Sequence, residues 1–170
     1  MAVDSGHLRT KRPLNPVAGP YGHPFHPILV TVPIGAWVAS LVFDVVSRSS
    51  DDPEIFATGS YWLIGLGVLG ALAAAVFGFL DLLRIPSGTP AHRTGLLHMG
   101  LNLAVAAAFA VSFLLRRGDT DEEVSAGLIA LSVVALAALG LSGWLGGKLT
   151  YRYGVRVVEE EVQADGYRSS

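Results

Sequence analysis

The chain has 170 residues, of which 51% are hydrophobic and 15% charged, and its 12 Lys and Arg nearly balance its 14 Asp and Glu. This balance argues against nucleic acid as a partner, because nucleic-acid-binding domains carry a basic excess. The absence of cysteine excludes disulfides, thiolate zinc sites, cysteine-ligated iron–sulfur clusters and covalently attached c-type haem. Any metal or cofactor must therefore be held by His, Asp, Glu, Met or backbone groups.

Two polar tails flank the apolar part of the chain. Residues 1–21 are rich in proline and glycine, which is typical of segments without regular structure, and we expect a mobile tail there. Residues 151–170 contain three consecutive glutamates and are expected to form a solvated tail with little fixed structure. The domain between them is predicted to cover residues 22–150, and no internal repeat is evident.

Four segments of this domain are almost free of charge. A membrane-crossing helix needs roughly 20 mostly apolar residues, because each residue adds about 1.5 Å across a core of about 30 Å. The pattern predicts four spans, at about 27–46, 61–83, 94–115 and 126–149. A soluble four-helix bundle would show a charged face on each helix, and these segments have none. We therefore predict an all-α, integral membrane four-helix bundle.

Two features of the spans predict how the helices bend and pack. Pro33 lacks an N–H and should leave the carbonyl of Leu29 without its helical partner, which bends the first span. Gly70, Ala74 and Gly78 repeat at four-residue spacing in the second span, and small residues at this spacing allow helices to approach closely. Gly143 and Gly147 repeat the pattern in the fourth span.

The distribution of Lys and Arg predicts the orientation. With four spans, both tails and the 84–93 loop lie on one side of the membrane. That side carries Arg9, Lys11, Arg12, Arg84, Arg93, Lys148, Arg152, Arg156 and Arg168, and the other carries Arg48, Arg116 and Arg117. Because the basic side faces the cytoplasm, we expect both termini there.

Polar residues gather on the same predicted side. His23 and His26 open the first span, Asp81 ends the second, and His98 and Asn102 begin the third. His98 and Asn102 are four residues apart and therefore share one helical face. These groups form either a functional site or hydrogen bonds that only join the helices, and both readings stay open at this point.

Asp81 needs a partner inside the protein. An aspartate costs about 2.5–3.5 kcal/mol at the bilayer centre and less near the rim, so its side chain should face the bundle. We expect it to pair with His98, Arg84 or Lys148. His92, by contrast, is expected in a solvated loop.

Four stretches of the sequence point to a known family. "HPFHPILVTVPIGAWVASLVFD", "GFLDLLRIP", "HRTGLLHMGLN" and "SGWLGGKLTYRYGVRV" resemble the domain-of-unknown-function 2231 family of predicted bacterial membrane proteins. The resemblance covers the chain from about Gly22 to Val157 and implies no settled activity. Some relatives resemble fusions to Rieske-type iron–sulfur domains, which implies redox work near the membrane, but this chain has neither such a domain nor a cysteine.

The first functional hypothesis is a redox or metal-binding membrane module. Two axial histidines from facing helices can hold a b-type haem; the candidate cofactor-binding residues are His26, His98, Asn102 and Arg84, with Arg93 and Lys148 as further partners for the propionates. Asp81 would orient one imidazole. A transition metal is the other candidate, and its ligands would be His23, His26, Asp81 and His98.

The second hypothesis is a non-enzymatic membrane protein. The chain would then be a small permeation or proton-relay subunit, or would dock another protein, since histidine titrates near neutral pH and suits a proton relay. Besides the lipid bilayer, the expected partners are a second copy of the chain or a redox partner protein. No nucleophile–base pair, phosphate-binding loop or carboxylate dyad is evident, so the chain on its own is not expected to be an enzyme.

The predicted orientation can be tested by cysteine labelling in intact cells. A membrane-impermeant thiol reagent should label a Ser50→Cys variant and leave a Ser170→Cys variant unlabelled. The chain has no cysteine of its own, so the signal comes from the introduced residue alone. Labelling of the Ser170→Cys variant alone would reverse the orientation and place the polar cluster outside.

Overall fold

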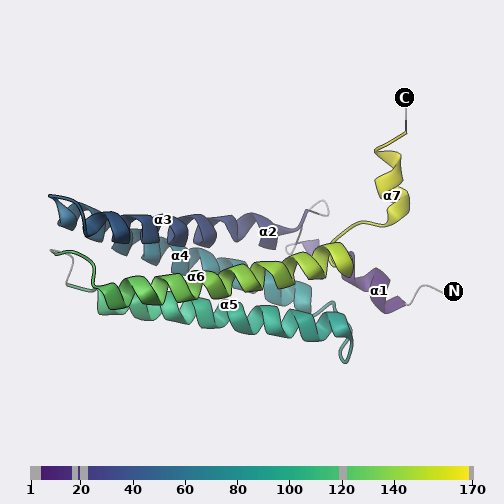
Figure 1. The fold of residues 1–170 in the computed structure, drawn as a ribbon. Helices are drawn as coiled ribbons and strands as arrows, with labels where there is room; N and C mark the ends of the chain where they lie inside the picture. Colours follow the sequence, from purple (N-terminus) through teal and green to yellow (C-terminus); the bar gives the residue numbers. More distant parts are fainter. Residues whose placement is uncertain (1–4, 17–18, 20–22, 119–121, 169–170) are drawn as a thin grey trace.

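The computed structural model describes residues 5–16, 19, 23–118 and 122–168. These residues form helices and no strand (Figure 1). The elements are α1 (Ser5–Thr10), α2 (Phe25–Leu29), α3 (Thr31–Ser47), α4 (Pro53–Leu82), α5 (Pro90–Leu115), α6 (Ala126–Gly147), a π-helical turn (Lys148–Arg152) and α7 (Glu160–Asp165). Four stretches are long and apolar enough to cross a membrane, namely Phe25–Ser47, Pro53–Leu82, Pro90–Leu115 and Ala126–Arg152. The prediction of an all-α, four-helix membrane bundle is confirmed.

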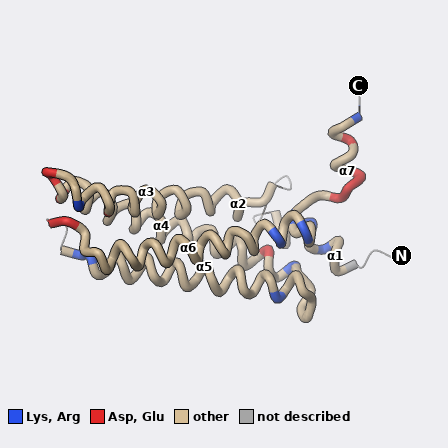
Figure 2. Tube along the Cα trace, in the orientation of Figure 1, with Lys and Arg blue, Asp and Glu red and all other residues tan. Residues whose placement is uncertain are grey.

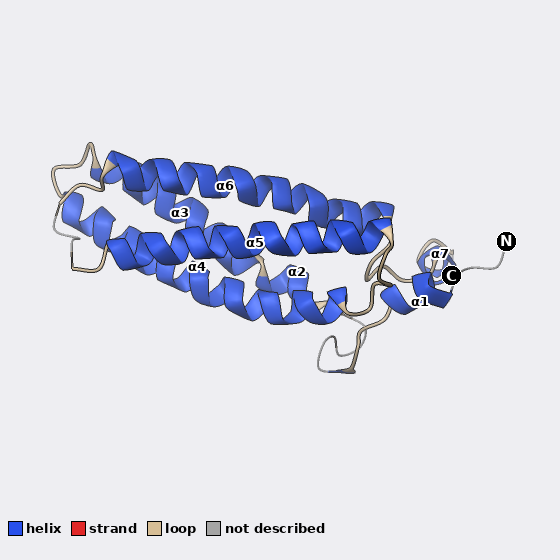
Figure 3. Cartoon of the chain, turned by 90° about the horizontal axis from the view of Figure 1, so that it is seen from below, coloured by secondary structure: helices blue, strands red, loops and turns tan. Residues whose placement is uncertain are grey.

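The bundle consists of two helical hairpins that lie side by side. The first joins α2 and α3 to α4, the second joins α5 to α6, and the connecting loops lie at the end opposite both termini (Figures 1 and 3). Charged residues are confined to the two ends, and the long middle of the bundle has none (Figure 2). This arrangement fits helices that traverse an apolar layer.

Two helices begin earlier than the sequence predicted. α4 starts at Pro53, where proline occupies the first turn and Glu54 favours the positive end of the helix dipole. α5 starts at Pro90, with Thr89 as its N-cap, because the Thr89 hydroxyl accepts a hydrogen bond from the His92 backbone N–H at 3.1 Å. His92 therefore lies in the first turn of a helix and not in a loop.

The first span is interrupted near Pro33. α2 ends at Leu29 and α3 begins at Thr31, while Val30 links them through a bond to the carbonyl of His26 at 3.1 Å. Pro33 stands four residues after Leu29 and has no N–H to donate to it. The proline thus explains why this span consists of two helical pieces.

Glycines of α4 form the surface on which α2 and α3 pack. A Cβ atom at Gly70 would come within 2.8 Å of Val32, one at Gly78 within 2.9 Å of His26, and one at Gly67 would collide with the indole of Trp37. The small-residue stripe of α4 therefore acts inside the chain, as its spacing predicted. In α6, a Cβ atom at Gly143 would meet nothing within 4 Å.

Three contacts between the hairpins join residues that are separated by the same number of positions along the chain. Asp44 contacts Arg116, which follows it by 72 residues. The same separation joins Trp37 to Phe109, whose rings stack with centroids 4.3 Å apart. It also joins His26 to His98, whose rings meet edge to face at 6.1 Å. Three pairs of equivalent residues thus meet between the hairpins.

The equal separation shows that α2 and α3 run parallel to α5 and face it in a constant register. The two hairpins are therefore related by an approximate two-fold rotation about an axis along the helices, which we call the pseudo-two-fold axis. Residues 72 positions apart occupy equivalent places about this axis. At the three contacts His faces His, Trp faces Phe and Asp faces Arg.

The Asp44–Arg116 pair closes the end of the bundle at the connecting loops. The guanidinium donates to the two carboxylate oxygens at 2.6 and 2.8 Å and to the hydroxyls of Ser60 and Ser112, both at 3.2 Å. Asp44 is 0% and Arg116 3% exposed. A bidentate pair with further hydrogen bonds can offset the cost of taking both charges out of water.

Because residues 44 and 116 face each other across the axis, the two charges should be exchangeable. Ser40 is buried one turn before residue 44, as Ser112 is before residue 116, so an arginine at either position finds a serine. Asp44→Arg or Arg116→Asp alone should cost about 3–5 kcal/mol by leaving buried like charges unpaired. The double exchange should recover at least about 2 kcal/mol as coupling energy in detergent unfolding. A double variant that is no more stable than the worse single variant would contradict the axis.

Candidate functional site

His26 of α2 is fixed on the surface of α4. Its Nδ1 lies 2.9 Å from the carbonyl oxygen of Ala74, and its ring rests on Gly78, four residues further along the same helix. A carbonyl can only accept, so Nδ1 carries the proton and donates. Gly78 leaves room for the ring, and the Ala74 carbonyl determines which tautomer is present.

His98 of α5 is fixed on α6 in the same way. Its Nδ1 donates to the carbonyl oxygen of Ser142 at 2.8 Å, and its ring rests against Gly146, four residues later. Ser142 adds a hydroxyl that donates to the His98 carbonyl at 3.2 Å. Each hairpin thus seats one imidazole on a small residue and a glycine four residues apart.

The two imidazoles differ at their second nitrogen. The Nε2 atom of His98 accepts a hydrogen bond from the side-chain amide of Asn102 at 3.1 Å, and the same amide donates to the His98 carbonyl at 2.9 Å. The equivalent of Asn102 in the first hairpin is Val30, which has no polar side chain. The Nε2 atom of His26 accordingly has no hydrogen-bond partner among the described residues.

Asp81 lies on the same face of α4 as Gly78, three residues further along the helix. Its ion-pair partner is Arg156, whose Nε is 3.2 Å from the Asp81 carboxylate. The expectation of His98, Arg84 or Lys148 as the partner is therefore wrong. Arg156 was missed because it lies in the segment read as a solvated tail, although Val155 and Val157 beside it are apolar.

The remaining predicted residues lie apart from the imidazole pair. His23 is exposed, Arg84 donates to the backbone carbonyl of Arg9 at 3.1 Å, and Lys148 lies 5.7 Å from the ring centres of Trp144 and Tyr153. Within the described ranges, no three His, Asp or Glu side chains come close enough to hold a metal ion. The structure therefore brings His26 and His98 together but does not assemble the four-residue metal site with His23 and Asp81.

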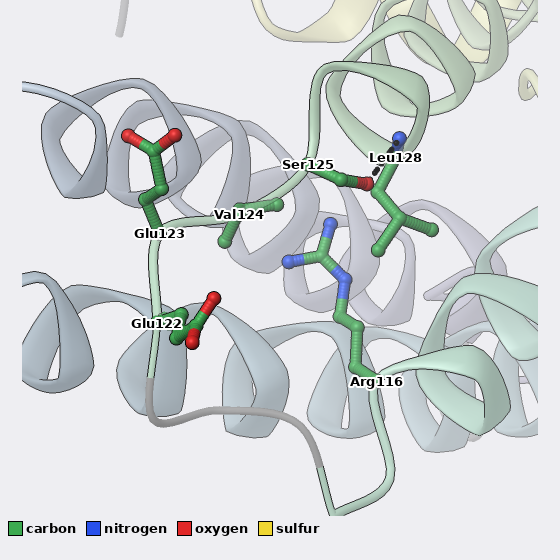
Figure 4. A pocket seen from close by; sticks show the side chains of 7 residues that line it. Arg116, Glu122, Glu123, Val124, Ser125 and Leu128 are labelled. Carbon is green, nitrogen blue, oxygen red and sulfur yellow. Dashed lines mark hydrogen bonds between the residues drawn. The ribbon is translucent and has the colours of Figure 1, made fainter.

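A pocket lies at the opposite end of the bundle, away from the histidines. It has a volume of about 170 Å³, and Arg116, Leu128 and the loop residues 122–125 line it together with Ala57. Figure 4 shows the Arg116 side chain extending from α5 toward the start of α6. The guanidinium is already bonded to Asp44. The sequence offered a signal for this pair, because both charges end apolar spans on the same side.

The outward faces of the bundle identify its surroundings. Large apolar side chains such as Leu69, Val134 and Leu141 are about two-thirds exposed, at 67%, 67% and 64%. An apolar exterior over four helices of spanning length is that of a multi-pass helical membrane protein.

The chain belongs to the family described as "Predicted membrane protein (DUF2231)", whose model matches residues 22–159. The resemblance read from the sequence is thereby confirmed. No curated protein and no solved structure gives a significant match.

The contact between the His26 ring and Gly78 predicts the effect of adding a methyl group at residue 78. Gly78→Ala should push the imidazole off the Ala74 carbonyl and lower the free energy of unfolding by about 1–3 kcal/mol, as overpacking does. Gly143→Ala is the matched control, since alanine there meets open space and is the better helix former by about 1 kcal/mol. Detergent unfolding of both variants provides the comparison. Equal stability of the two would show that Gly78 does not seat His26.

Proposed function

We propose that the protein binds one transition-metal centre, as a bare ion or as the iron of one haem b, between His26 and His98. The observation that carries this proposal is the pair of imidazoles on the pseudo-two-fold axis, each with Nδ1–H fixed on a backbone carbonyl. Histidines that bind metals commonly donate their other ring N–H in this way, which leaves Nε2 as the ligand atom.

The separation of the rings suits a shared ligand. Their centroids are 6.1 Å apart, and a metal–nitrogen bond spans about 2.0–2.1 Å, so an ion between the rings would need both Nε2 atoms to turn toward it. Asn102 would have to release the Nε2 atom of His98, whereas His26 offers its nitrogen without such a change. A bound centre would supply electron-transfer or Lewis-acid chemistry at the membrane.

The packing distinguishes the two forms of the centre. Gly78 and Gly146 hold the rings against α4 and α6, which suits a small ion. A haem would fit only if α2 and α5 parted to admit the macrocycle. Arg84, a candidate partner for the propionates, is in contact with Arg9 in the present arrangement.

A permeation or proton-relay role is the weaker candidate. The middle of the bundle is filled by the stacked Trp37 and Phe109 and by Ile64, Val105 and Ala135, all at most 4% exposed. These residues separate the histidine pair from Asp44 and Arg116 at the other end. A proton taken up by the imidazoles therefore meets a dry apolar layer and not a polar path.

We also propose the membrane in which the chain lies and the side on which its termini lie. The excess of Lys and Arg at the end that carries the termini supports a bacterial plasma membrane location with both termini in the cytoplasm. The imidazole pair would then face the cytoplasmic side, where a soluble redox partner could reach it.

Absorption spectra and metal analysis of detergent-purified protein test the proposal. Protein from cells supplied with haem precursor and metals should carry one centre per chain, and His26→Ala and His98→Ala should each reduce its occupancy at least about tenfold. His92→Ala is the control and should retain full occupancy, because His92 lies in the first turn of α5 away from the pair. Folded wild-type protein without colour or metal would refute the proposal.

A further inference from the structure

The histidine end of the bundle is covered by both tails, which form one folded cap. We define the cap as α1 with the following residue Lys11, together with residues 153–158. Thr10 is 4% exposed, and its carbonyl accepts a hydrogen bond from the Arg156 N–H at 3.0 Å. The Lys11 ammonium donates to the carbonyls of Val157 and Val158, both at 3.4 Å. The described residues of the two tails are therefore more ordered than the sequence indicated.

The cap is seated on apolar residues next to the histidine pair. Leu82, Ile85, Leu149 and Val155 form a buried cluster, and Met99, the neighbour of His98, packs against it. The π-helical turn after α6 brings the chain back across the end of α4, near α1 (Figures 1 and 3). Through Met99, the apolar seat of the cap lies next to His98 in the sequence.

Arg156 connects the cap to the bundle, although both its backbone conformation and the burial of its guanidinium are energetically unfavourable. Its φ of 62° lies in the left-handed region, which costs energy for a residue other than glycine. Its side chain is 6% exposed and pairs with Asp81, yet Nε, Nη1 and Nη2 have no hydrogen-bond partner among the described residues. Buried polar groups without hydrogen bonds destabilise the state that contains them.

The Asp44–Arg116 ion pair at the other end of the bundle differs from the Asp81–Arg156 pair in its hydrogen bonds. Arg116 makes hydrogen bonds to both oxygens of Asp44 and to two serines, within the helices themselves. Arg156 makes a single ion contact from a segment outside the bundle. The first pair joins elements that cannot separate without unfolding, whereas the second joins a removable segment to the bundle.

We infer that the cap is a gate over the His26–His98 site and that the Arg156–Asp81 pair is its latch. Opening the latch frees residues 153–158 and α1 together and admits a ligand or redox partner, while the bundle stays folded. The inference rests on the proposed function in one respect, because it takes His26 and His98 to be a ligand site. The movement of the cap can be measured without any metal or haem.

A cysteine beneath the cap tests the gate in the purified full chain. In the cysteine-free sequence, Met99→Cys should react with a water-soluble maleimide at least about tenfold faster when combined with Asp81→Asn or Arg156→Gln, which corresponds to about 1.4 kcal/mol. Tyr151→Cys, 91% exposed in the wild type, should react equally in all backgrounds. Glu159→Gln, which removes an exposed ion pair with Arg12, should leave the Met99→Cys rate unchanged.

Hydrogen exchange separates opening of the gate from loss of the fold. Amides of residues 153–158 and of α1 should exchange faster in both latch variants, and those of α3 and α5 should not. If Asp81→Asn unfolds the bundle, Arg156→Gln carries the test, because residue 156 lies outside the spanning helices. Equal maleimide rates in folded Arg156→Gln and wild-type backgrounds would overturn the gate, whatever the metal content proves to be.

Discussion

Contact between equivalent residues across the pseudo-two-fold axis is the interaction on which the structure depends. In lipid there is no hydrophobic force to drive helices together, so close packing and polar contacts must hold them. Both kinds of contact occur along the axis, in three pairs: His26 with His98, Trp37 with Phe109, and Asp44 with Arg116. The same geometry that joins the hairpins therefore brings two imidazoles together in an otherwise apolar bundle.

The two ends of the bundle use buried charge differently. At the loop end, a guanidinium is satisfied by a carboxylate and two hydroxyls, and breaking such a pair leaves a buried charge uncompensated. At the histidine end, the buried Arg156 guanidinium pairs with Asp81, has no hydrogen-bond partner among the described residues and belongs to the cap. Stability thus lies with Asp44 and Arg116, and the end that carries the candidate site is the one able to open.

The sequence allowed the four spans and the close packing at the α4 glycines to be predicted, because both depend on local patterns of charge and size. The seats of His26 and His98 could not be predicted. They depend on which carbonyl of a neighbouring helix faces each ring, and this follows from the packing of α2 on α4 and of α5 on α6.

The contacts across the axis and the latch could not be predicted, for different reasons. Asp44 and Arg116 stand 72 residues apart, and no local pattern shows that the two helices carrying them face each other. Arg156 lies in a short segment whose structure depends on contacts with Thr10 and Asp81, which are distant in sequence. Composition does not show that such a segment folds back onto the bundle.

Nitrogen NMR of the histidine side chains tests the central claim most directly, since it reports the protonation of each ring nitrogen. The account predicts that His26 and His98 both carry the proton on Nδ1. It also predicts that both Nε2 resonances shift together when one equivalent of Zn²⁺, Cu²⁺ or haemin is added to the purified chain. A proton on Nε2 of either ring in the ligand-free protein, or Nε2 resonances that none of the three additions moves, would contradict it.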